Sequence, residues 1–103
     1  WEPTMPAYWL SYRIHADATR EARAKELTDR VKAMAGSSWE DSTSFLIFSS
    51  EQNIDAIAQD LKSAINLRTD LIVLCMTEVK AARLAGAVND EAIFKLMPHI
   101  RKV

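Results

Sequence analysis

The most informative segment of the sequence is Leu71-Ile72-Val73-Leu74-Cys75-Met76, an unbroken apolar run of strand length. A strand that is covered on both faces reads as a continuous apolar run, because neither face has to be compatible with water. We therefore predict that this segment is the last core strand of a sheet and that both of its faces are buried.

Three further strands are indicated earlier in the chain. From Tyr8 to His15, aromatic and branched residues occupy every second position, which is the period of a strand with one apolar face. A short strand over residues 37–40 is centred on Trp39, and turn-forming residues at 41–43 separate it from the apolar run Phe45-Leu46-Ile47-Phe48. These two segments predict a β-hairpin.

Helical patterns lie between these strands. Asp17 can cap a helix whose apolar stripe extends to about Ala35, and Gly36 is expected to end it. Capping side chains up to Asn53 precede a second helix, which continues to about Ile65.

The C-terminal part of the sequence is less regular. Residues 77–88 have no clear pattern, whereas residues 89–91 can cap a short helix that Pro98 ends. The side chains of this helix that are expected to point inward are Ile93, Leu96 and Met97.

The order of these elements predicts the fold class. Strand, helix, strand, strand, helix, strand is the ferredoxin-like βαββαβ plan, an α+β fold with a four-stranded antiparallel sheet and both helices on one face. The short C-terminal helix is extra. Because Phe45 and Ile47 point away from the face of Leu46 and Phe48, the uncovered face is also apolar, and we expect a homodimer through this face of the sheet.

Length and composition set the organisation of the chain. Its 103 residues have room for one core, with a ferredoxin-like domain predicted over residues 5–78 and a C-terminal extension over residues 79–103. We interpret residues 1–4 as the remnant of an expression tag. The single cysteine and the lack of a transmembrane segment or secretion signal favour a cytoplasmic protein without a membrane partner.

No motif for cofactor chemistry is visible. The sequence has no glycine-rich phosphate loop, no paired cysteines and no histidine–carboxylate spacing, so we predict neither a cofactor nor a metal site. His15 would need a nucleophile or a second catalytic group to act as a general base, and His99 has no visible partner either. With a formal net charge of -1, the chain also has no overall positive field.

Three segments suggest a family resemblance: Tyr8-Trp9-Leu10-Ser11-Tyr12, then Trp39-Glu40-Asp41-Ser42-Thr43-Ser44-Phe45, and the apolar last strand. From Met5 to about Met76, the chain resembles the SinR-like proteins. These are relatives of the small ferredoxin-fold endoribonucleases and integration adaptors of CRISPR systems and of virulence-associated protein D. The resemblance implies the same fold.

In that family the first strand typically ends in Tyr-Asp, and the aspartates of two subunits can bring a divalent metal to the dimer axis. This chain has Tyr12-Arg13 at that place. A guanidinium group has no lone pair to offer a metal, so the exchange removes the metal site that the resemblance implies. Asp17 or Asp41 could substitute, but Asp17 is better explained as a helix cap and Asp41 as a turn residue.

Two sets of basic residues are candidates for nucleic-acid binding. Arg13 and His15 share a strand face with Trp9, and a positive charge beside an aromatic ring can hold a phosphate and stack a base. The simpler interpretation, which we favour, is that Arg13 pairs with Glu40 or Asp41 across the hairpin and that His15 lies at a solvated strand end.

The second set of basic residues has few acidic residues near it in the sequence. These residues could form a basic rim for a nucleic-acid backbone, or they could simply keep the chain ends soluble. They are Lys80, Arg83, Arg101 and Lys102.

Three hypotheses for function follow. The first is a non-catalytic, homodimeric interaction or accessory protein of the SinR-like group that associates with nucleic acid. The alternative is a metal-dependent endoribonuclease that resembles the CRISPR-associated family. In the third, the segment from Lys80 onward exchanges between subunits or docks on a different protein.

Overall fold

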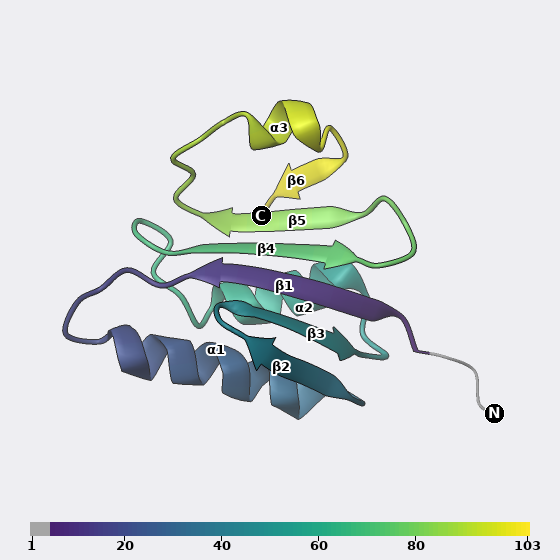
Figure 1. Ribbon diagram of the computed structural model, residues 1–103, viewed down its shortest axis with the longest axis horizontal. Coiled ribbons are helices and arrows are strands. Elements are labelled where there is room, and N and C mark those ends of the chain that lie inside the picture. Colours follow the sequence, from purple (N-terminus) through teal and green to yellow (C-terminus); the bar gives the residue numbers. More distant parts are fainter. Residues whose placement is uncertain (1–4) are drawn as a thin grey trace.

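The computed structural model describes residues 5–103, so the interpretation of residues 1–4 lies outside the described residues. The described part of the chain forms six strands in one sheet and three helices (Figure 1). In chain order, the elements are β1 (Ala7–Arg13), α1 (Arg20–Met34), β2 (Ser38–Ser42), β3 (Phe45–Ser49), α2 (Ile54–Lys62), β4 (Leu71–Met76), β5 (Ala82–Gly86), α3 (Ile93–Leu96) and β6 (Ile100–Lys102).

The strands follow one another across the sheet in the order β2-β3-β1-β4-β5-β6. Neighbouring strands are antiparallel, except that β5 and β6 are parallel. The predicted α+β class and the hairpin of β2 and β3 are confirmed. The predicted four-stranded ferredoxin-like sheet is wrong, because the C-terminal part of the chain adds β5 and β6 to the edge of β4.

The sequence pattern of β5 explains why it was not predicted. Its residues are Ala82-Arg83-Leu84-Ala85-Gly86, and alanine and glycine are depleted in strands. The tertiary setting outweighs this preference, since β4 would otherwise leave a row of backbone N–H and C=O groups unpaired. The turn before β5 is closed by the Met76 N–H, which donates to the Ala81 carbonyl oxygen over 3.0 Å.

The main core lies between the sheet and the two long helices, which cover the same face of the sheet (Figure 1). Tyr8 of β1 stacks on Phe48 of β3 with ring centroids 5.6 Å apart. The other fully buried large side chains of this core are Leu10, Leu27, Val31, Leu46, Ile57, Leu61, Ile72 and Leu74. The apolar stripe predicted for α1 therefore faces the sheet, and so do the buried side chains of α2.

A second, smaller core lies on the opposite face of β4 and β5. Val73 and Cys75 are buried there, so both faces of β4 are covered, as predicted. The cover at this place is the chain's own C-terminal segment, not a second copy. The partly buried side chains of that segment are Val88, Ile93, Phe94 and Met97.

Two details of the helices differ from the predictions. Thr19, not Asp17, is the N-cap of α1, and the Asp17 carboxylate instead accepts hydrogen bonds from Arg23. Gly36 lies just past the end of α1, as predicted, with the extended residue Ala35 as the C-cap between them. Leu96 is 80% exposed, because α3 is short and presents Phe94 to the sheet in its place. The predicted Asn53 cap of α2 is confirmed by its bond from the Ala56 N–H.

Candidate functional site

One part of the sheet has no helix over it. Trp9 of β1 is paired with Ile47 of β3, and Ile47 is paired with Trp39 of β2, so these side chains share one face. Phe45 lies two residues from Ile47 on the same face, with its ring centroid 5.9 Å from Trp9 and 6.4 Å from Trp39. We call these four residues the aromatic face.

The aromatic face is exposed to solvent. Trp39 is 46% exposed and Ile47 is 36% exposed, and both line a shallow hollow of about 270 Å³. Trp9 also packs against the small core under α3, so the aromatic face is continuous with the covered half of the same sheet surface. A contiguous apolar patch of this kind on a small protein is typical of an interaction surface.

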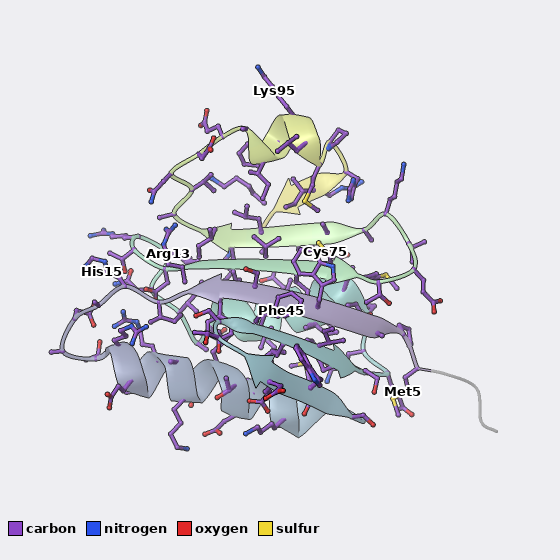
Figure 2. The ribbon with its side chains drawn as sticks, viewed as in Figure 1. Met5, Arg13, His15, Phe45, Cys75 and Lys95 are labelled. Carbon is purple, nitrogen blue, oxygen red and sulfur yellow. The ribbon has the colours of Figure 1, made fainter. Side chains whose placement is uncertain are left out.

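Arg13 and His15 lie at one end of the sheet, at and beyond the end of β1, whereas Met5 lies at the opposite end (Figure 2). The Arg13 guanidinium donates to the Ala87 carbonyl oxygen over 2.8 Å. The expected pairing of Arg13 across the hairpin is not formed, and Glu40 pairs instead with Lys32 at 3.5 Å. The His15 side chain is exposed.

A buried carboxylate that sequence reasoning missed lies behind His15. Asp70 is fully buried and accepts hydrogen bonds from the backbone N–H groups of His15 and Asn66, each at 2.8 Å, and from Arg23 Nε at 2.9 Å. Burial raises the pKa of Asp70, but the hydrogen bonds from Arg23, Asn66 and His15 outweigh it, so the net shift of the pKa is downward. The available signal was an acidic residue directly before the most apolar strand.

Asp17 is not a free ligand. Arg23 and the Thr19 N–H donate to its carboxylate, and hydrogen bonds from Arg23 lower the pKa of Asp17 to about 2. Asp41 is exposed in the edge strand β2, whereas Asp17 follows β1, and β3 lies between these two strands. Within residues 5–103, no group of three histidine, cysteine or acidic residues is placed to hold a metal ion.

The second set of predicted basic residues is largely brought together. Lys80, Arg83 and Arg101 line one hollow of about 370 Å³, and His99, for which the sequence suggested no partner, lines it as well. We call these four residues the basic cluster. Arg83 and Arg101 are register partners on β5 and β6. Lys102 is instead paired with Leu84, whose side chain lies on the α3 side, so Lys102 faces away from the cluster.

The members of the basic cluster differ in how they are held. Arg83 has a side chain only 12% exposed, and its Nε donates to the Asp55 carboxylate over 2.6 Å. That hydrogen bond lowers the pKa of Asp55, and the charge of Arg101 acts in the same direction. Among the described residues, no carboxylate lies within ion-pair distance of Lys80 or Arg101.

The basic cluster is remote from Arg13. Arg13 is paired with Leu71 at the start of β4, whereas Lys80 lies in the turn that follows the end of β4. The six predicted nucleic-acid residues therefore do not form one continuous surface on a single chain.

Comparison with models of protein families, with curated proteins and with solved structures finds no match to this chain. None of the helices in residues 5–103 has both the length and the apolar character needed to span a membrane.

Proposed function

We propose that the protein is a non-catalytic accessory module that forms a homodimer through the aromatic face and associates with nucleic acid through its basic residues. The observation that most supports this proposal is the exposure of Trp39 and Ile47 beside Trp9 and Phe45 on a sheet surface whose other half is covered. Burying such side chains removes apolar area from water, which is the main driving force of association.

A second copy is the occupant that fits this face best. The aromatic face is formed by three neighbouring strands, and a surface of this kind can pair with itself about a twofold axis. The four residues of the aromatic face are uncharged, so they themselves bring no like charges together when two copies approach. The module would act in the cytoplasm, as the single buried cysteine suggests.

Membership of the SinR-like group belongs to the same proposal. We infer that β1 to β4 with α1 and α2 form a ferredoxin-like unit to which β5 and β6 are added. The element order and the position of β1 between β3 and β4 support this inference. The alternative, a metal-dependent endoribonuclease, is less favoured, because the Asp17 carboxylate is already bound by Arg23.

The dimer is tested by sedimentation equilibrium of the wild type and of Ile47→Glu. We expect a wild-type dimer and an Ile47→Glu monomer, because each copy would bury a carboxylate without a partner. Leu96→Glu is the matched control, since Leu96 is 80% exposed on α3 and lies outside the aromatic face. A monomeric wild type, or a dimer that Ile47→Glu leaves intact, would contradict the proposal.

Nucleic-acid association is tested by fluorescence anisotropy with labelled single-stranded RNA, single-stranded DNA and duplex DNA at two salt concentrations. Binding that weakens with salt, without cleavage, is expected from phosphate contacts. Cleavage that requires Mg²⁺ would support the endoribonuclease instead. Absence of binding to all three probes would direct attention to a protein partner.

A further inference from the structure

The basic cluster is a concave arrangement and not a strip. Lys80 from the turn before β5, Arg83 from β5, and His99 and Arg101 from around β6 line the same hollow. Its volume of about 370 Å³ is at the lower end of the range of about 300–1,000 Å³ that is typical of small-ligand sites. The cluster therefore has the size of a site for one compact group, whereas a nucleic-acid backbone would need an extended groove.

The cluster has more hydrogen-bond donors than acceptors. A guanidinium group has five N–H donors. In Arg83, the Nε group donates a hydrogen bond to Asp55, and Nη1 donates to the Ala82 carbonyl oxygen at 2.9 Å. These two bonds hold the guanidinium in place and leave other donors available. Within residues 5–103, Asp55 is the one acidic residue paired with the cluster, so the three cations Lys80, Arg83 and Arg101 retain a net positive charge.

The register of the strands adds a second argument. Arg83 and Arg101 lie directly opposite each other on neighbouring strands, which are about 4.8 Å apart in a sheet. Like charges at such positions destabilise a sheet. Asp55 offsets this repulsion only in part, and a bound anion would offset the remainder.

We propose that the basic cluster binds one terminal phosphate group, the phosphomonoester at the end of a nucleic-acid strand. A phosphomonoester has a charge of about -1.5 to -2 and three acceptor oxygens, whereas each backbone phosphate has a single negative charge. Several donors around one hollow favour the more highly charged, better-accepting group. The identity of the ligand as a strand end rests on the proposed association with nucleic acid.

The experiment compares two single-stranded oligonucleotides of the same sequence, labelled at the 3′ end, with either a 5′-phosphate or a 5′-hydroxyl group. We expect the full chain to bind the phosphorylated strand about tenfold more tightly, as the gain of charge-assisted hydrogen bonds implies. Arg101→Glu should abolish this preference. Lys102→Glu is the matched control, because it makes the same change of charge on the next residue, which faces away from the cluster.

Inorganic phosphate alone, titrated by calorimetry, separates the two proposals. If both oligonucleotides bind equally well and Arg101→Glu behaves like Lys102→Glu, the phosphate site is overturned while association with nucleic acid stands. If neither oligonucleotide binds but inorganic phosphate binds and Arg101→Glu abolishes that binding, the phosphate site stands and the nucleic-acid partner is wrong. Binding of neither oligonucleotide nor phosphate would overturn both.

Discussion

At the scale of single residues, the Asp70 side chain connects two backbone segments that are distant in sequence. It joins the segment after β1, through the His15 N–H, to the segment before β4, through the Asn66 N–H, and Arg23 of α1 neutralises its charge. A buried carboxylate is tolerated only when it is paired and hydrogen-bonded in this way. Asp70 is therefore a structural residue of the fold.

Asp70→Ala should lower the free energy of unfolding by about 3 kcal/mol or more, because it leaves buried N–H groups and the Arg23 charge without their acceptor. Urea denaturation followed by circular dichroism measures the loss. Asp29→Ala is the control, since Asp29 is an exposed partner of Lys25 and should matter by only about 0.5 kcal/mol. Equal effects of the two changes would contradict the assignment of Asp70.

The two carboxylates bound to Arg23 also predict a dependence of stability on pH. The pKa of Asp17 is lowered to about 2 and that of Asp70 is lowered as well, against about 3.9 in an unfolded chain. Groups with lowered pKa values contribute their full stabilisation above the unfolded value and lose it as the pH falls through the folded value. The urea concentration at the midpoint of unfolding should therefore decrease as the pH is lowered from about 4 to about 2. Asp17→Asn should show a smaller fall, and an unchanged acid transition in this variant would exclude a contribution from Asp17.

At the scale of secondary-structure elements, the end of β5 depends on a glycine. Gly86 has φ of +113°, and a Cβ atom there would lie 1.9 Å from the Asp70 carbonyl oxygen, which accepts the Ala87 N–H. The close approach of these two backbone segments allows β5 to pair with β4 from Leu71 to Cys75. Both the conformation and the space require glycine.

Gly86→Ala should cost at least about 3 kcal/mol, because backbone must move to relieve the clash. Gly36→Ala makes the same chemical change where a Cβ atom would be 2.8 Å from Met5 Cε, the end of a flexible side chain, and should cost clearly less. Thermal denaturation of the two variants gives the comparison. A smaller effect at Gly86 than at Gly36 would be inconsistent with this account of β5.

The thiol of Cys75 is buried in the small core to which Phe94 of α3 also contributes. Burial raises the pKa of Cys75 to about 11, so little thiolate is available in the folded chain. Phe94→Ala should loosen the cover and speed the reaction of Cys75 with a disulfide reagent, whereas Leu96→Ala should leave the rate unchanged because Leu96 points to solvent. Equal rates for the wild type and both variants would show that α3 does not control access to Cys75.

At the scale of the whole molecule, one surface of the sheet is divided between two kinds of cover. The C-terminal segment covers the half over β4 and β5, and the aromatic face over β1, β3 and β2 stays open. If a second copy covers the open half, folding and association are linked by mass action. The melting temperature of the wild type should then rise with protein concentration, and that of Ile47→Glu should not. Concentration-independent melting of both proteins, measured by calorimetry, would argue against the linkage.

Periodicity was sufficient to predict much of this fold. The alternation in β1, the apolar run of β4 and the stripe of α2 are local patterns, and each gave the correct element. The same reasoning failed for β5, where Ala82 and Ala85 are buried although their residue type is not typical of strands. It also failed for Leu96, because a helix as short as α3 has too few residues for its apolar phase to be read.

The same distinction between local pattern and tertiary packing applies to the candidate sites. Charge and residue type alone indicated Lys80, Arg83 and Arg101 as a set, because a scarcity of acidic neighbours is visible along the chain. The structure adds His99 to this set and removes Lys102 from it. Both outcomes depend on the parallel pairing of β5 with β6, which brings together residues that are distant in sequence. Local periodicity is a property of neighbouring residues, so it can be read directly from the sequence. Strand neighbours, shared faces and buried partners such as Asp70 and Arg23 arise only when distant segments pack together.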